Sequence, residues 1–473
     1  MTGGSSHQGR KPDAVSMAVG WGGIFLWGIL LTLHLGITPK GVLAQEIVRP
    51  QRLIIIPSMT ITGQYDTNIK QDPTDEIEDY STTYSPGASI SYRWPNTVLS
   101  GSYVWNFEEF DDLETLNNMS QSGSGRLTHV FNPFVNITGG FSYSKSESEE
   151  VDLDLTVEGR LAESARERQS SESLGANAAI QLAYFARLPI GLNYSFSDNL
   201  ASAADEVDVQ SHTFGANASY LVVPARGHSL DASYTVSIRE ENRNTTRSPP
   251  DPALNFAANN LTEHSVTASY THRFDPSFSA TGGGGLSWAA HSSDPRLEDE
   301  LDPIYFAGLT KRWTRTGVGL NWTLDTGRGG GFGGTTTTQT VGLVADHAPH
   351  LNLSLALNLN LSDSELENEA TGLGRDNLRY LVSPSFSYQF LRYFSLSGSY
   401  AYTRNEFDDE GGAFVPTSKF QEFSAGVTLI LRPDLPQFAV NYFHSEEDSE
   451  DDTDDFIRDV LLFSVNYSLP FGL

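Results

Sequence analysis

Four histidines stand in serine-rich stretches of the chain, and a serine beside a histidine base could act as a hydrolytic nucleophile. They are His129, His212, His264 and His272, and each ring would also need a polar group to orient it. The chain has 11 His and many Ser residues, so such neighbours arise by chance. It contains no Gly-x-Ser-x-Gly elbow and no Gly-Lys-Ser/Thr phosphate loop. We therefore predict that the protein is not an enzyme and that it binds no organic cofactor.

A second group of residues could bind cations, because the segment from Glu446 to Asp455 carries eight carboxylates. Carboxylate oxygens at this density can hold Ca²⁺ or Mg²⁺. The order of the residues lacks the EF-hand pattern and its glycine, so a solvated, charged loop is the interpretation that we prefer. The alternative is a divalent-cation site that bridges this loop to anionic lipopolysaccharide, with candidate ligands Asp448, Asp451, Asp452, Asp454 and Asp455.

A third group consists of small neutral polar residues that alternate with apolar ones. Such side chains can hydrate a channel and hydrogen-bond hydroxyl-rich solutes without fixing an ion. The alternative is a lumen plugged by inward-folded loops, for which the segment 145–168 is long enough. The positions that we assign to the wall of a lumen are Ser100, Ser102, Asn193, Ser195, Ser233, Asn321, Asn352, Asn358 and Asn466.

The elements that would hold these residues are β-strands, because apolar and polar residues alternate with a period of two. Every odd position from Leu351 to Leu361 is Leu, and the even positions are Asn, Ser or Ala. Near the end of the chain, apolar residues from Leu461 to Leu473 occupy every second position, opposite Ser464 and Asn466. A helix would scatter these residues around its circumference, so the pattern predicts long strands with one apolar face.

Two kinds of connection alternate between these strands. The short kind contains Pro or Gly, as at residues 94–96, 131–133, 187–189, 224–227, 274–276, 348–350 and 432–436. The other kind is long and acidic, as at residues 66–79, 145–168, 240–260, 362–376, 404–410 and 446–455. Tight turns at one end and long loops at the other are typical of outer-membrane barrels. We predict an all-β fold, an antiparallel up-and-down transmembrane β-barrel of about 18–20 strands, with both termini on the periplasmic side.

The first 44 residues have the features of a secretory signal peptide. Arg10 and Lys11 precede an apolar stretch, and Val42-Leu43-Ala44 forms a small-residue cleavage site before Gln45. The apolar stretch is longer than usual, so an uncleaved membrane anchor is the alternative. We assign residues 1–44 to a cleaved signal peptide and 45–473 to the barrel, and we expect the mature protein in the outer membrane.

Charge excludes one class of function. The chain has 30 Lys and Arg against 59 Asp and Glu, a net charge of −29. Such a surface repels phosphate backbones, so we predict that the protein does not bind nucleic acid. The chain also has no Cys, which excludes disulfides and thiolate metal sites.

The C-terminal segment 460–473 resembles the targeting strand that the barrel-assembly machinery reads, although it ends in Leu473 rather than Phe. The region from about Gln45 onward resembles the outer-membrane β-barrel porins of Gram-negative bacteria, above all those found with exopolysaccharide or surface-polymer export systems. This resemblance implies an outer-membrane channel or export conduit, and it carries over no catalytic residues. It also implies that the assembly machinery and periplasmic export components are partners, together with outer-membrane lipid and lipopolysaccharide.

These observations lead to one functional prediction and one alternative. The prediction is a porin-like channel that passes neutral or saccharide cargo by passive diffusion, or that exports an exopolysaccharide. The alternative is a sealed structural or adhesive barrel that binds partners through its acidic extracellular loops.

Overall fold

Antiparallel strands account for almost all of the computed structural model. It describes residues 52–69, 76–149, 168–201, 207–224, 227–243, 261–291, 300–329, 334–368, 373–409, 417–431, 435–449, 455–469 and 471–472. The predicted signal peptide lies outside these residues, so it stays a prediction. Among the described residues, no helix has the length and apolar character needed to cross a membrane.

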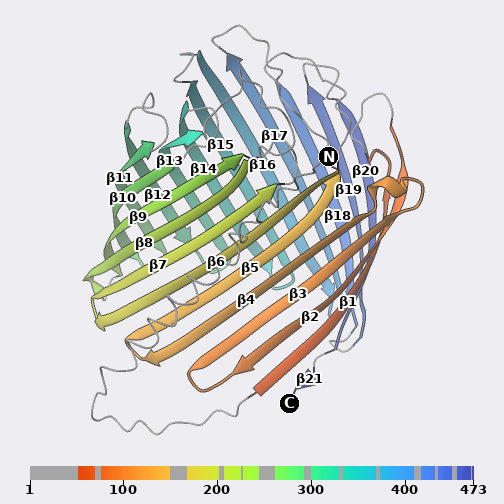
Figure 1. The fold of residues 1–473 in the computed structure, drawn as a ribbon, viewed down its shortest axis with the longest axis horizontal. Helices are drawn as coiled ribbons and strands as arrows, with labels where there is room; N and C mark the ends of the chain where they lie inside the picture. Colours follow the sequence, from red (N-terminus) through yellow and green to blue (C-terminus); the bar gives the residue numbers. More distant parts are fainter. Residues whose placement is uncertain are drawn as a thin grey trace, which may run out of the picture. The chain divides into compact units, whose positions relative to one another are not determined.

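The described residues form twenty long strands, one two-residue strand and one short 3-10 helix, η1 (Glu114–Leu116). Figure 1 labels the strands in chain order. They are β1 (Arg52–Asp66), β2 (Asp79–Arg93), β3 (Thr97–Phe110), β4 (Asn118–Asn132), β5 (Val135–Glu149), β6 (Arg168–Phe185), β7 (Leu188–Ala201), β8 (Val207–Val223), β9 (His228–Arg243), β10 (Leu261–Asp275), β11 (Phe278–His291), β12 (Glu300–Arg312), β13 (Thr316–Gly329), β14 (Gly334–His350), β15 (Leu353–Asn368), β16 (Leu373–Leu391), β17 (Phe394–Asp409), β18 (Ser418–Ile430), β19 (Gln437–Ser449), β20 (Phe456–Ser468) and β21 (Phe471–Gly472).

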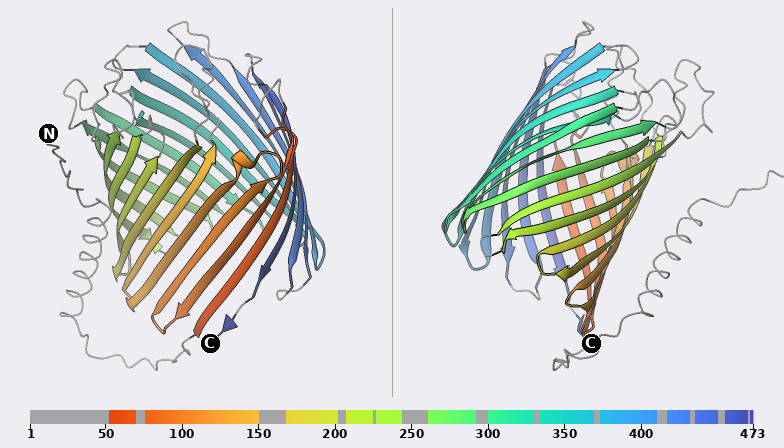
Figure 2. Two further views of the ribbon diagram at one scale, coloured as in Figure 1. Left: turned by 45° about the vertical axis from the view of Figure 1, so that its right-hand side comes forward. Right: turned by 90° about the vertical axis from the view of Figure 1, so that its left-hand side faces the viewer.

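The sheet closes on itself. Each strand pairs antiparallel with its neighbours in sequence, and β1 also pairs with β20, from Ser58 opposite Ser468 to Asp66 opposite Val460. The short β21 continues this seam, with Gly472 opposite Ile54. Figures 1 and 2 show the first and last strands side by side after the sheet has curled round. The predicted all-β, up-and-down barrel is confirmed, and twenty long strands is the upper end of the predicted range.

The two ends of the barrel differ, as the sequence predicted. Connections that follow even-numbered strands are two to six residues long, from residues 133–134 to residues 431–436. We call this end the turn rim. Connections that follow odd-numbered strands reach 18 residues, at 150–167, and we call this end the loop rim. Figure 2 shows the strands running between the two rims at a tilt.

Several acidic segments that we expected to be loops are strand ends. Strand β15 continues to Asn368 and β16 begins at Leu373, so most of the expected loop 362–376 is paired backbone. Likewise β17 runs to Asp409 and β19 to Ser449. Charge did not end these strands, because an antiparallel neighbour of matching length continues to satisfy the backbone hydrogen bonds.

One hairpin turn lies elsewhere than expected. We predicted the turn at residues 348–350 and a strand from Leu351, but β14 runs to His350 and the turn is Leu351-Asn352. The register shifts between His347 and His350, and this irregularity takes Pro349 into the strand end. Leu351 is fully exposed in the turn.

Candidate functional site

The enclosed face of the barrel carries the polar set of each strand. Successive residues of a barrel strand point alternately inward and outward. Several buried polar residues of the described chain stand next to exposed apolar ones: Asp66 beside Tyr65, Ser287 beside Leu286 and Asp302 beside Leu301. Only four apolar side chains of the described residues are buried, so this barrel has no packed apolar core. The polar face is therefore the one that the barrel encloses.

The outward face is apolar and ends in aromatic residues at both rims. Near the turn rim, the rings of Phe274 and Phe278 are stacked with centroids 4.7 Å apart. Towards the loop rim, the ring of His264 stacks on Trp288 at 4.9 Å. On β10, His264 and Phe274 lie ten residues apart. At about 3.3 Å per residue and a tilt of about 40°, this spacing corresponds to about 25 Å, the height of the apolar band of outer-membrane barrels.

Hydroxyl groups form hydrogen-bonded pairs across several neighbouring strands of the enclosed face. Both members of each pair belong to the polar set, so each strand offers its neighbour a donor and an acceptor without a charge. The oxygen–oxygen distances run from 2.6 to 3.4 Å. The pairs are Ser102–Ser124, Ser146–Ser171, Ser197–Ser211, Thr213–Ser237, Ser233–Thr267, Thr271–Thr281, Thr338–Ser364, Thr340–Ser362 and Ser399–Ser424.

Asparagine amides on this face lie flat over glycines of the next strand. Asn193 faces Gly215, and a Cβ placed on that glycine would lie 2.5 Å from Oδ1 of Asn193. Asn321 faces Gly342 with the same distance. Real Cβ contacts are essentially never shorter than 3.0 Å, so these amides occupy the space of a missing side chain. The same arrangement recurs at Asn177 over Gly140, Asn217 over Gly191 and Asn441 over Gly426.

Most residues that the sequence assigned to a lumen wall stand on the enclosed face. Six of them are also exposed there, so no other part of the protein covers them. These six are Ser102, Asn193, Ser195, Asn321, Asn358 and Asn466. Ser100 and Ser233 are partly covered. The exception is Asn352, which lies in the turn between β14 and β15 and not on the wall. Its carbonyl accepts a hydrogen bond from the backbone N–H of Gln389.

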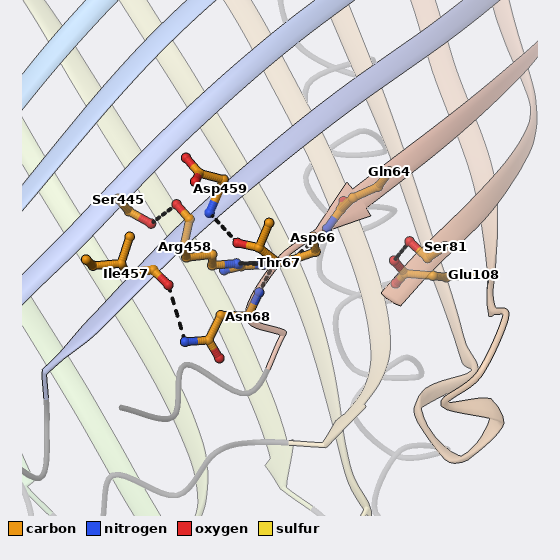
Figure 3. A network of polar contacts seen from close by, with 10 residues as sticks. All are labelled: Gln64, Asp66, Thr67, Asn68, Ser81, Glu108, Ser445, Ile457, Arg458 and Asp459. Atoms are coloured by element: carbon orange, nitrogen blue, oxygen red, sulfur yellow. Dashed lines mark hydrogen bonds and ion pairs between the residues drawn. The ribbon is translucent and has the colours of Figure 1, made fainter. Parts of the chain in front are cut away.

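A polar cluster closes the seam between β1 and β20 at the loop rim, as Figure 3 shows. The guanidinium of Arg458 donates to both carboxylate oxygens of Asp66, with Nε at 3.1 and 3.0 Å. Asn68 donates its amide to the carbonyl of Ile457 at 3.3 Å. The backbone N–H of Asp459 donates to Oγ1 of Thr67 at 2.9 Å. Asp66 and Asn68 are fully buried, so these contacts are shielded from water.

A second buried carboxylate at this rim organises a loop. Asp79 accepts hydrogen bonds from the backbone N–H groups of Tyr80, Asp112 and Leu113, at 2.7, 3.1 and 2.8 Å. The last two belong to the connection between β3 and β4, so one side chain fixes its path. Nearby, Ser81 donates to Glu108 at 3.2 Å.

The predicted metal ligands are only partly described. Asp448 forms an ion pair with Lys419 at 3.0 Å, and Asp455 accepts the backbone N–H of Ser449 at 2.6 Å. Asp451, Asp452 and Asp454 lie outside the described residues. The described part of the chain contains no group of three His, Cys, Asp or Glu side chains arranged to hold a metal ion.

The strand histidines pair with tyrosine and threonine rather than with serine. Nδ1 of His212 is hydrogen-bonded to the hydroxyl of Tyr194 at 2.9 Å, and Nδ1 of His264 to that of Tyr234 at 2.8 Å. Both histidines belong to the outward set of their strands, among aromatic rings. His129 is hydrogen-bonded to Thr97 at 2.7 Å, and His272 lies 3.4 Å from the hydroxyl of Tyr270. The absence of catalysis remains a prediction.

Two features of the site were missed from sequence. The Asn–Gly pairs depend on strand register, which the alternation of residue types does not give. The Asp66–Arg458 pair joins residues 392 positions apart, and neither lies in a motif. Asn193 and Gly215 lie on β7 and β8, which are joined at the loop rim by residues 202–206, so no tight hairpin turn indicated their register.

Comparison with known proteins supports the fold. No family model matches the chain, and no curated protein matches its sequence. Among solved structures, the FrpB iron transporter from Neisseria meningitidis is similar with a TM-score of 0.58 at 10% identity, covering 87% of this chain and 82% of that one. The siderophore receptor PirA from Acinetobacter baumannii gives 0.56 at 10% identity, over 87% and 80%. The ferric citrate transporter FecA in its unliganded form gives 0.55 at 10% identity, over 88% and 78%.

At this level of identity the likeness concerns the fold alone. None of these three structures is a polymer-export porin. They support the resemblance to outer-membrane β-barrels, and the resemblance to export porins stays a prediction. The chain has the fold of a large outer-membrane β-barrel.

Proposed function

We propose that this protein is an outer-membrane transport barrel whose lumen passes hydrophilic, uncharged solutes. The observation that carries the proposal is the enclosed wall, where Ser, Thr and Asn side chains face one another across strands and remain exposed. Such side chains exchange hydrogen bonds with hydroxyl-rich solutes without fixing an ion. Charged residues such as Arg126 and Asp231 also belong to the enclosed face. A saccharide, whether a small sugar or a polymer under export, is the cargo that suits this chemistry.

Strand number is compatible with a wide lumen. Barrels of 16–18 strands leave an aqueous channel, and 22-stranded outer-membrane transporters have a plugged one. Twenty strands lie between these classes. The exposure of Asn193, Asn321, Asn358 and Asn466 on the enclosed face favours open space at their level.

The similar structures add a second cargo class. FrpB is an iron transporter, PirA a siderophore receptor and FecA a ferric citrate transporter. An iron chelate is therefore the second candidate for this barrel, and the fold match over most of the chain is what favours it. The sealed adhesive barrel is the weaker interpretation, because a sealed barrel has no need of an exposed hydroxyl wall.

Liposome swelling tests the proposal. Vesicles containing the refolded residues 45–473 are diluted into isosmotic neutral sugars, into sugar acids of matched size, or into ferric citrate. We expect fast swelling in neutral sugars and slower swelling in the acids, which the acidic loops repel. No swelling with any solute from protein that is folded by its circular dichroism would overturn the proposal in favour of a sealed barrel. Entry of ferric citrate alone would favour the second candidate.

A further inference from the structure

The odd-numbered strands from β3 to β17 carry similar residues at one level of the barrel. The fifth residue after the start of each odd-numbered strand from β3 to β17 is Ser, Asn or Gly, and each belongs to the enclosed face. These strands all begin at the turn rim, so the eight residues lie at the same distance from it along their strands. We call them the amide ring: Ser102, Gly140, Asn193, Ser233, Gly283, Asn321, Asn358 and Ser399.

Several residues on the neighbouring strands add hydroxyl or amide groups at this level. Ser102, Ser233 and Ser399 each form a hydroxyl pair, with distances of 2.9, 2.6 and 2.6 Å to their partners. Gly140 is covered by the amide of Asn177. At Gly283 the ring of Phe306 takes the place of an amide. No member of the amide ring carries a charge, but Arg126 of β4 lies directly opposite Gly140 and belongs to the same enclosed face.

The Asn–Gly pairs determine how far the ring projects. Because Gly215 and Gly342 have no Cβ, the amides of Asn193 and Asn321 lie along the wall instead of across the lumen. Each amide still offers two donors and one acceptor oxygen. A side chain on either glycine would take this space, and the amide would have to swing inward.

We propose that the amide ring is the level at which the barrel selects its solute, and that the facing glycines set its width for uncharged polyhydroxylated cargo. This inference rests on the proposed transport function. It assigns specificity to Asn193, Asn321 and Asn358, with Gly215 and Gly342 as positioning residues. A solute that passes the ring would exchange one hydrogen bond to the wall for another. Such contacts are weak enough for a transport site to release the solute that it binds.

Two sets of variants change the ring in opposite directions. Gly215→Ala combined with Gly342→Ala pushes two amides inward and narrows the ring. Asn193→Ala combined with Asn321→Ala removes the same amides and widens it. The matched control is Gly282→Ala, because Gly282 belongs to the outward face of β11 and a Cβ there meets nothing within 4 Å.

The readout is the ratio of liposome swelling rates in a tetrasaccharide and in a monosaccharide. We expect the glycine double variant to lower this ratio several-fold and the asparagine double variant to raise it, with the control unchanged. Heat-modifiable mobility on a gel establishes that each variant is folded. An unchanged ratio in both folded double variants would overturn the inference while leaving the channel intact. Failure of the unaltered barrel to pass any sugar would instead overturn the proposed function.

Discussion

The guanidinium of Arg458 on β20 donates to both carboxylate oxygens of Asp66 on β1, although 392 residues separate them. The two strands are the first and last of the barrel, so this ion pair joins the seam where the sheet closes. The Asp66 side chain is 2% exposed and that of Arg458 27%. Removing one partner of such a pair leaves a buried charge without compensation, which is far more costly than the loss of an exposed pair.

We therefore expect Arg458→Ala to destabilise the barrel by about 3–5 kcal/mol. Urea unfolding of the lipid-reconstituted barrel, followed by tryptophan fluorescence, measures the change. The control is Lys419→Ala, which breaks the Lys419–Asp448 pair, whose side chains are 41% and 55% exposed. For that variant we expect less than about 1 kcal/mol. Equal effects of the two substitutions would contradict the role of the seam.

Asp79 gives a local prediction. Its buried carboxylate accepts three backbone N–H groups, two of them in the connection between β3 and β4. Without these acceptors the N–H groups of Asp112 and Leu113 lose their partners, at a cost of about 1–3 kcal/mol. We expect Asp79→Ala to raise amide hydrogen exchange in residues 111–117, measured by mass spectrometry. Asp111→Ala, an exposed neighbour, should leave the exchange as it was.

The contribution of the β10–β11 turn to the stability of the barrel should depend on pH. Hydrogen bonds from Ser277, through both its hydroxyl and its backbone N–H, and from Lys311 lower the pKa of Asp275 to about 2. The ionised carboxylate therefore favours the folded state above the ordinary pKa of about 3.9, and this contribution disappears as the pH falls through about 2. The urea midpoint of the unaltered barrel should exceed that of Asp275→Asn from pH 7 to about pH 4 and converge with it towards pH 2. A difference that grows below pH 4 would contradict this assignment.

The fold was predictable because apolar and polar residues alternate along each strand of a membrane barrel. The leucines from Leu353 to Leu361 occupy every second position of β15, and their alternation was enough to assign an outward face. The order of short and long connections gave the up-and-down topology. Strand ends were less predictable, since β15 continues through Glu365, whose charge suggested a loop. Backbone pairing, rather than side-chain charge, determines where these strands end.

The sequence predicted which residue types face the enclosed side of the barrel, but it did not predict their contacts. Alternation placed Asn193 and Asn321 on the enclosed face, but their contacts with Gly215 and Gly342 follow from register. Asn352 was misplaced, because the same alternation continues through a two-residue turn that the pattern cannot show. Long-range partners such as Asp66 and Arg458 leave no signal in a single sequence.

The central claim is that the polar face of each strand meets water and the apolar face meets lipid. Adjacent residues test it, since Leu192 and Asn193 occupy opposite faces of β7 and both are exposed. The chain has no Cys, so Leu192→Cys and Asn193→Cys each introduce a single thiol without background. In vesicles treated with a membrane-impermeant maleimide, we expect labelling of the thiol at position 193 and none at position 192. A lipid-soluble maleimide should label position 192. Labelling of position 192 but not of position 193 by the impermeant reagent would contradict the account.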